Sequence, residues 1–444
     1  MDIIQIEDKN LSHYSYAVVS NSEMVLIDPA RNPQPYYDLA KEHHAKIIAV
    51  IETHPHADFV SSHFEIHKTT GADIYVSKLL GAEYPHKTFD EGDTIKVGKV
   101  SLKALNTPGH SPDSICIVAI DEKGNEEAVF TGDTLFIGDC GRPDLREKAG
   151  TLTAKREVLA KEMYHSLREK LMTLPDSVLV YPAHGAGSLC GKGLSEKNTS
   201  TIGIEKASNW CLQEMSAEDF VKELLNNQPF VPQYFAYDVS LNKKGADNFL
   251  ESINDVKMHD TIPSQLNDYL IVDARSETEY KQGFFKNSVN LMADGPFETW
   301  LGSLVAPNEK FYLVAKSKDV LQSLIERAAK IGYEKQIEEA FIVKGVNGKK
   351  IDKPDVDKFR NALDDFTIMD IRNPSEANEK KIFKNAIHIP LFELKDRINE
   401  IPTDKPIVVH CAGGYRSAAG ASIIKNFLKK ETEVFDLGED VKTF

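Results

Sequence analysis

The second half of the chain contains an internal repeat, which constrains the fold more than any other feature of the sequence. Residues 271–275 read Ile-Val-Asp-Ala-Arg and residues 368–372 read Ile-Met-Asp-Ile-Arg, an offset of 97. Residues 285–288 read Phe-Lys-Asn-Ser and residues 383–386 read Phe-Lys-Asn-Ala, an offset of 98. Two matches in consistent register indicate that one structural unit occurs twice.

Each copy of the repeat also contains the elements of an α/β domain. An acidic stretch of helical character follows each Asp-x-Arg, and an apolar strand followed by a helix comes later, at 311–315 and at 407–410. We therefore expect two related α/β domains, at 258–350 and 355–444. The first half alternates short apolar runs with loops rich in His, Asp, Gly and Pro, and we expect one larger α/β domain over residues 1–240.

Local patterns in the first half predict its strands and helices. Runs rich in β-branched residues between turn residues predict strands at 15–20, 23–28, 46–52, 100–105, 114–120, 128–131 and 177–181. Apolar residues at helical spacing predict helices at 60–69 and 151–173.

Charge and hydropathy limit the partners of the chain. A formal charge of −15 argues against a nucleic-acid-binding surface. No apolar stretch approaches the ~20 residues that span a bilayer, and no basic segment precedes an apolar run at the start, so we expect a cytoplasmic protein without a membrane partner. The five cysteines lie at irregular spacing and are poor material for a disulfide framework.

Histidines and aspartates recur in four loops that follow predicted strands. They are His54, His56 and Asp58 in Thr-His-Pro-His-Ala-Asp, His110 in Pro-Gly-His, Asp133 in Gly-Asp-Thr and His184 in Pro-Ala-His. Taken alone, such residues are more often turn or helix-cap residues than ligands. Strand ends of a layered α/β domain gather at one edge, however, where ligands commonly bind. The four loops together therefore predict one metal site, and imidazole with carboxylate suits zinc or iron.

These motifs resemble the metallo-β-lactamase superfamily, whose fold is an αββα sandwich. Dinuclear members carry a histidine directly after the aspartate of His-x-His-x-Asp, and this histidine binds a second metal. Phe59 stands at that position here. Because a phenyl ring cannot ligate, the resemblance implies that the second metal site is lost.

Two features of the chain resemble the persulfide dioxygenase branch of that superfamily. One is the missing ligand at position 59, and the other is the sequence Gly-Asp-Cys-Gly-Arg-Pro-Asp at 138–144. Those enzymes hold one non-haem Fe(II) per chain through two histidines and one aspartate. Carried over by motif, the ligands are His54, His110 and Asp133. A triad of this kind leaves coordination positions open for O₂ and for the substrate.

Five further residues are expected around this metal. The resemblance leaves His56, Asp58 and His184 to orient ligands and waters, and His56 as a fourth ligand is an alternative. Arg142 is expected to hold an anionic substrate group or to order the site, unless it simply pairs with a nearby aspartate. Cys190 follows the His184 loop, so it either contacts or relays sulfur or packs in the core.

A second chemical signal is Cys411, in Val-Val-His-Cys-Ala-Gly-Gly-Tyr-Arg-Ser at 408–417. A buried strand is expected to end at His410 and a helix to start near Ser417, so Cys411 lies in a short loop at a helix N-terminus. Two glycines let successive N–H groups point at one sulfur. These amides, the helix dipole and Arg416 favour a thiolate or a persulfide anion. The alternative is a buried structural cysteine.

The spacing of this loop distinguishes two classes of enzyme. Four residues separate Cys411 from Arg416, whereas phosphatases with a similar loop usually have five. The loop, with the Asp-x-Arg at Asp370 and Arg372, resembles rhodaneses, whose cysteine accepts a sulfane sulfur and passes it on. In the upstream copy Lys316 stands in place of Cys411 and no glycine follows. That copy resembles an inactive rhodanese homology domain, which implies a scaffolding or interface role.

The order of the three domains resembles the CstB-type persulfide dioxygenase–rhodanese fusions of bacteria. The resemblance implies that O₂ and Fe(II) oxidise a low-molecular-weight thiol persulfide to sulfite and free thiol. Cys411 then takes sulfane sulfur from a second persulfide and passes it to sulfite, giving thiosulfate in a sulfide detoxification route. The resemblance also implies a homo-oligomer, either a dimer or a tetramer.

Two other functions are compatible with parts of the pattern. One is a zinc thioester hydrolase of the glyoxalase II kind with an appended sulfur carrier, which predicts two metals and hydrolysis without O₂; Phe59 argues against it. The other is a persulfide sensor or sulfur-delivery protein with a structural metal, which predicts persulfidation of Cys411 without turnover.

Overall fold

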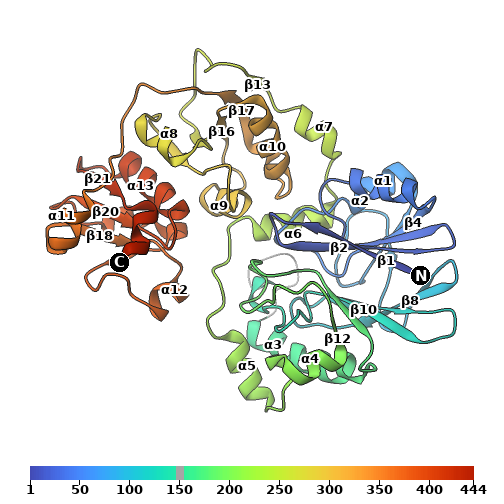
Figure 1. Ribbon diagram of the computed structural model, residues 1–444. Coiled ribbons are helices and arrows are strands. Elements are labelled where there is room, and N and C mark those ends of the chain that lie inside the picture. The colour runs from blue at the N-terminus through green and yellow to red at the C-terminus, as the bar shows by residue number, and fades with distance from the viewer. Residues whose placement is uncertain (147–154) are drawn as a thin grey trace. The chain divides into compact units, whose positions relative to one another are not determined.

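A computed structural model describes residues 1–146 and 155–444 of the chain (Figure 1). The described residues form two compact units, one made of 1–251 with 329–332, the other of 252–328 with 333–444. The expected helix at 151–173 begins outside the described residues. Its described part is α3 (Arg156–His165), which continues through a π turn and a 3₁₀ turn to Thr173. Within the described ranges, no helix is both long and apolar enough to cross a membrane.

Two six-stranded sheets form the centre of the first unit. The first sheet contains β1 (Asp2–Asp8), β2 (His13–Ser20), β3 (Glu23–Ile27), β4 (Lys46–Ile51), β5 (Asp73–Val76) and β6 (Lys87–Thr88), in sequence order. The second has the order β12-β11-β10-β9-β8-β7, with β7 (Thr94–Val97), β8 (Val100–Asn106), β9 (Ile115–Ile120), β10 (Glu126–Gly132), β11 (Leu179–Pro182) and β12 (Ser200–Thr201). Each sheet mixes antiparallel with parallel pairs.

Alternation along the strands sends apolar side chains into different cores. In β3, Val25 and Ile27 join the core between the two sheets, whereas Met24 and Leu26 pack towards helices on the outer face. These helices are α1 (Gln34–Glu42) and α2 (His63–Thr70). The outer face of the second sheet packs against α3, α4 (Ile202–Ser208) and α5 (Ala217–Leu225) (Figure 1). The unit therefore has four layers in the order αββα, followed by α6 (Phe235–Lys244) and α7 (Phe249–Asn254).

The second unit contains two parallel sheets, one for each copy of the repeat. The first has the order β13-β17-β16-β14-β15, with β13 (Met258–His259), β14 (Leu270–Asp273), β15 (Ser288–Asn290), β16 (Phe311–Ala315) and β17 (Ile337–Ile342). Its helices are α8 (Glu277–Gln282), α9 (Phe297–Leu304) and α10 (Lys318–Ala329). The second has the order β19-β18-β20-β21, with β18 (Thr367–Asp370), β19 (Ile387–His388), β20 (Ile407–His410) and β21 (Val434–Asp436). Its helices are α11 (Val356–Asn361), α12 (Pro374–Glu379) and α13 (Tyr415–Phe427).

The repeated Asp-x-Arg motif has the same structural role in both copies. Arg275 Nε lies 2.9 Å from Asp273 Oδ1, and Arg372 Nε lies 2.9 Å from Asp370 Oδ1. In each copy the guanidinium also donates to a backbone carbonyl just after the following helix. Both motifs are buried, so each arginine ties the end of a strand to the helix that follows.

Polar contacts join the two copies within the second unit. Ser422 of α13 accepts a hydrogen bond from the backbone of Asn290, over 3.0 Å between Oγ and N. Lys281 Nζ lies 2.6 Å from Asp436 Oδ2, and both side chains are buried. The first copy therefore packs directly on the sheet and helix that carry the Cys411 loop.

Candidate functional site

Three of the predicted metal ligands meet in the first unit. His54 follows β4, His110 follows β8 and Asp133 follows β10, and their possible ligand atoms lie within 4.8 Å of one another. Nε2 of His110 is 3.5 Å, and Nε2 of His54 is 3.9 Å, from Asp133 Oδ2. All three side chains are buried. The loops come together because the strands that precede them end at one edge of the sandwich.

The donor set of this triad fits a divalent transition metal. Two imidazoles and a carboxylate are ligands that iron and zinc accept. Neither carboxylate oxygen of Asp133 has a hydrogen-bond partner among the described residues, although the side chain is fully buried. A buried carboxylate without a partner is costly, and a bound cation removes that cost.

Thr53 and Asp28 orient His54 through the Nδ1 side of its ring. Asp28 at the end of β3 accepts the Thr53 backbone N–H over 2.7 Å and the Thr53 hydroxyl over 2.8 Å. The Thr53 hydroxyl oxygen lies 3.0 Å from Nδ1 of His54. Because this hydroxyl donates to Asp28, it accepts from Nδ1–H, which leaves the Nε2 lone pair of His54 directed to the triad.

His184, Asp58 and Cys190 form a second group directly beside the triad. Their possible ligand atoms lie within 4.8 Å of one another. Nε2 of His184 is 3.3 Å from Asp58 Oδ2 and 3.5 Å from Asp133 Oδ1, and Nδ1 is 3.2 Å from the Ser12 carbonyl oxygen. Burial, and then the charges of Asp58 and Asp133, raises the pKa of the Cys190 thiol well above its usual range.

His56 belongs to a different cluster. Its Nε2 lies 3.1 Å from Asp28 Oδ1 and 3.6 Å from Glu52 Oε2. Burial alone lowers the pKa of His56, but the charge and hydrogen bond of Asp28, with Glu52 and Asp58, raise it to about 9. This arrangement favours His56 as a neighbour of the triad rather than as a fourth ligand.

Phe59 is buried against two histidine rings. Its ring centroid is 3.9 Å from that of His13 and 4.3 Å from that of His56. His13 at the start of β2 is itself buried, and burial, followed by the charges of His184 and His56, lowers its pKa well below the usual range. His13 was not expected from the sequence, since it lies in a hairpin strand without any motif around it.

Arg142 orders the loops around the metal cluster. Its guanidinium pairs with Asp144, with Nε 2.7 Å from Oδ1 and Nη2 2.7 Å from Oδ2. It also donates to the carbonyl oxygens of Leu189, Pro229 and Phe230. All five N–H groups are thereby used, and the side chain is 1% exposed. Arg142 thus makes the pair with Asp144 that was expected as an alternative, but it does so as a buried side chain. This geometry favours ordering the site over binding an anionic substrate.

Cys411 lies in the loop between β20 and α13, as the sequence predicts. The loop turns at Gly414, whose φ is +105°, a conformation that favours glycine. The backbone N–H of Gly414 donates to Cys411 Sγ over 3.1 Å. In the other copy, Lys316 directly follows β16 and no cysteine is nearby in sequence. The five cysteines of the chain, all within the described residues, are free and buried.

Arg416 is held by a carboxylate that was not expected from the sequence. Its Nη1 lies 2.5 Å from Glu376 Oε2, and its Nη2 lies 2.7 Å from Glu376 Oε1. Glu376 sits in the first turn of α12, four residues after Arg372. Tyr415, beside Arg416, donates its hydroxyl to the Met292 carbonyl oxygen of the first copy.

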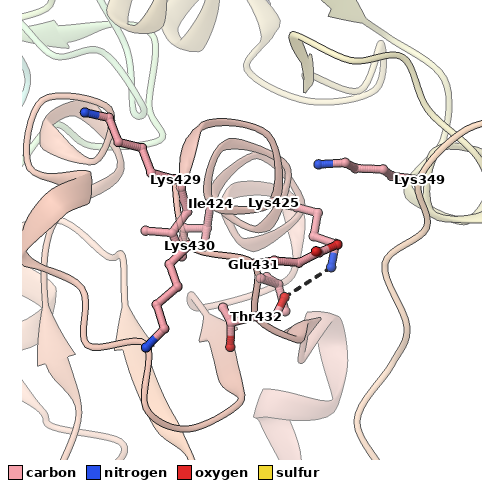
Figure 2. A pocket seen from close by; sticks show the side chains of 9 residues that line it. Lys349, Ile424, Lys425, Lys429, Lys430, Glu431 and Thr432 are labelled. Atoms are coloured by element: carbon pink, nitrogen blue, oxygen red, sulfur yellow. Dashed lines mark hydrogen bonds between the residues drawn. The ribbon is translucent and has the colours of Figure 1, made fainter.

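A basic surface hollow lies elsewhere on the second unit. Lys349, Lys425, Lys429 and Lys430 are among its lining residues, which do not include Cys411. Figure 2 shows Lys429 and Lys430 pointing in different directions, and Lys425 donates to the Thr432 carbonyl oxygen over 3.2 Å. Because these ammonium groups do not converge on one point, the hollow is not built as an anion site.

Comparison with known proteins gives matches to both halves of the chain. The metallo-beta-lactamase superfamily matches residues 9–184, and the rhodanese-like domain matches residues 258–345 and 355–442. The human protein "Persulfide dioxygenase ETHE1, mitochondrial" is 32% identical over 224 residues, which cover 50% of this chain and 79% of the human one.

Two further relatives cover different shares of this chain. The Arabidopsis thaliana protein "Hydroxyacylglutathione hydrolase cytoplasmic" is 31% identical over 176 residues, which cover 39% of this chain and 63% of the Arabidopsis one. A crystal structure of a metallo-beta-lactamase from Staphylococcus aureus is 31% identical in sequence and superposes with a TM-score of 0.68. The superposition covers 77% of this chain and 99% of the Staphylococcus aureus chain, so the likeness extends beyond the first unit.

Proposed function

Because this chain belongs to the persulfide dioxygenase family of the metallo-beta-lactamase superfamily and carries two rhodanese-like domains, we propose that it runs two consecutive steps of sulfur metabolism. The fold expected from the sequence, a metallo-β-lactamase sandwich followed by two rhodanese-like domains, is confirmed. The enzyme is a persulfide dioxygenase and a sulfurtransferase. We assign the first activity to residues 1–240, the second to 355–444, and a supporting role to 258–350.

The first step is the oxidation of a low-molecular-weight thiol persulfide. One persulfide, RSSH, reacts with O₂ and water to give the thiol RSH, sulfite and two protons, so the terminal sulfur is oxidised and O₂ is reduced. We assign one Fe(II) to His54, His110 and Asp133, where it would supply open coordination positions for O₂ and sulfur. The observation that supports this assignment is the buried Asp133 carboxylate, whose oxygens lack a hydrogen-bond partner within the described residues.

The protein's own groups around this centre position the reactants. Asp28 and Thr53 fix the tautomer of His54. Asp58 and His184 lie beside Asp133, where they can hold a water or a substrate proton. We assign Cys190 to contact with the substrate sulfur, and Arg142 holds the loop that carries Cys190 by donating to the Leu189 carbonyl.

The second step transfers a sulfane sulfur at Cys411. The Cys411 thiolate attacks the terminal sulfur of a second RSSH, which gives Cys411–S–S⁻ and RSH. Sulfite then attacks the outer sulfur of that persulfide, which forms thiosulfate and restores the Cys411 thiolate. Linking both sites in one chain raises the effective concentration of sulfite near Cys411.

Metal content and oxygen uptake together test this function. The purified full chain should contain one equivalent of iron and consume O₂ when glutathione persulfide is added under air. Two equivalents of zinc with no O₂ uptake would instead indicate the thioester hydrolase. Persulfidation of Cys411 without release of sulfite or thiosulfate would indicate the sensor.

A further inference from the structure

The cation beside the Cys411 loop, Arg416, is already paired with a carboxylate of the protein. Both terminal nitrogens of Arg416 bind Glu376 in a bidentate pair, at 2.5 and 2.7 Å. The Arg416 side chain is 15% exposed and that of Glu376 is 33% exposed, so the pair lies at the rim of the site rather than in the core. The pair as a whole is neutral, and the positive charge of Arg416 is directed to a protein carboxylate.

The proposed chemistry requires anions at this loop. Sulfite is a dianion, and it must approach a persulfide that is itself an anion on Cys411. A guanidinium is suited to binding such an oxyanion in a bidentate manner. Arg416 can offer the same pair of terminal N–H groups to sulfite only if it releases Glu376, because one such pair cannot bind two oxyanions in a bidentate manner at once.

The duplicated copy separates the capping role of Glu376 from its contact with Arg416. Glu279 occupies the matching position, three residues into α8, and completes a capping box with Ser276. Glu376 does the same with Asn373 in α12. The position that matches Arg416 in the first copy is Leu321, so Glu279 has no equivalent arginine to hold.

We propose that Glu376 is a positioning residue that sets the affinity of the Cys411 site for anionic sulfur compounds by competing with them for Arg416. The proposal rests on the sulfurtransferase function assigned to Cys411. Glu376 keeps Arg416 in place when the site is empty and gives up the guanidinium when an oxyanion enters. Its charge therefore weakens the binding of sulfite and thiosulfate and has little effect on uncharged reactants.

Sulfur transfer from thiosulfate to cyanide by the full chain tests this competition. Thiosulfate gives its sulfane sulfur to Cys411 and leaves as sulfite, and cyanide, which is mainly uncharged HCN at neutral pH, accepts the sulfur as thiocyanate. The Glu376→Gln variant keeps an amide oxygen for the Asn373 cap but loses the negative charge. We expect the KM for thiosulfate to fall about tenfold, with the KM for cyanide and the kcat within about twofold of wild type.

Two variants separate this competition from a structural effect. Glu279→Gln removes the matching capping carboxylate in the first copy and should leave the KM for thiosulfate unchanged. In the double variant Glu376→Gln with Arg416→Ala, the gain in thiosulfate affinity should disappear, because the effect of Glu376 acts through Arg416. An unchanged or raised KM in a folded Glu376→Gln variant, with a wild-type melting temperature, would overturn the proposal.

Alkylation of Cys411 gives a reading that does not need turnover. Iodoacetate is an anion and iodoacetamide is neutral, so the ratio of their rates at the Cys411 peptide, followed by mass spectrometry, reports the positive charge available there. This ratio should rise about tenfold in Glu376→Gln and stay at the wild-type value in Glu279→Gln. If the wild-type chain forms no thiocyanate, the sulfurtransferase assignment is wrong. If the ratio of iodoacetate to iodoacetamide rates does not rise in Glu376→Gln, the role proposed for Glu376 is wrong.

Discussion

The hydroxyl oxygen of Thr53 lies 3.0 Å from Nδ1 of His54, and the same hydroxyl donates to Asp28 Oδ2 over 2.8 Å. Asp28 also lies 3.1 Å from Nε2 of His56. One buried carboxylate thus supports both histidines of the His-x-His motif in different ways. It directs His54 towards the triad through Thr53, and it holds His56 directly.

Removal of the Thr53 hydroxyl should weaken metal binding. In Thr53→Val the Nδ1–H of His54 loses its acceptor, so the tautomer and the ring orientation are no longer fixed. We expect the affinity for Fe(II) to fall about 10- to 100-fold, as measured by competition with a chelator. Thr173→Val, at an exposed position, is the control. Equal affinities in both variants would show that the Thr53 contact does not support the metal.

A histidine at position 59 should restore a second metal. The superfamily resemblance assigns this position to a ligand of the second metal. Phe59 directly follows Asp58 in the loop, and its ring packs on that of His56. We expect Phe59→His to bind about two equivalents of zinc, where wild type binds one, as measured by elemental analysis. Phe59→Leu removes the same ring without adding a ligand and should stay at one equivalent. A single equivalent in both variants would show that Phe59 is not what limits the site.

Loss of the Cys411 thiol should separate the two activities. Cys411→Ser should consume O₂ with a persulfide substrate at nearly the wild-type rate, but its product should be sulfite in place of thiosulfate. Cys211→Ser, a buried cysteine in the core of the first unit, is the matched control for loss of a thiol and should still form thiosulfate. Chromatography of the sulfur anions with an oxygen electrode provides both readings. If Cys411→Ser lost O₂ uptake as well, the two sites would not be separable.

Acid should destabilise the second unit through His410. Burial lowers the pKa of His410 to about 4, although the charge of Asp370 raises it, whereas an exposed histidine titrates near 6.5. As the pH falls from 6.5 towards 4, the unfolded state takes up a proton that the folded state does not. The free energy of unfolding therefore falls by up to about 1.4 kcal/mol per pH unit. Between pH 7 and pH 5, we expect the melting temperature of the His410→Phe variant to fall less than that of wild type. A loss equal to that of wild type would contradict a neutral His410 in the folded protein.

The sequence was sufficient for the fold because its signals were local or repeated. The two Asp-x-Arg motifs, at Asp273 and at Asp370, predicted two copies of one α/β domain, and both motifs make the same strand-to-helix connection. The loops with His54, His110 and Asp133 were predicted to meet, and they do so at one edge of the sandwich. Strand-end loops converge in any layered α/β fold, so this part of the site needed no contact information.

The contacts that tune the two sites were not predictable in the same way. Glu376 lies 40 residues before Arg416, and its capping position gave no sign that it also reaches across to the catalytic loop. Arg142 donates to carbonyl groups near residues 189 and 230, which no motif connects to it. Backbone carbonyls carry no residue identity, so partners of this kind become visible only when the chain is folded.

The stoichiometry of the complete reaction tests the central claim most directly. The purified wild-type chain is given a limiting thiol persulfide under air, and persulfide, O₂ and thiosulfate are measured in the same vessel. If both steps run in sequence, one O₂ is consumed and one thiosulfate is formed for every two persulfides, with release of two thiols. Loss of persulfide without O₂ uptake, or sulfite as the final product with no thiosulfate, would contradict the account.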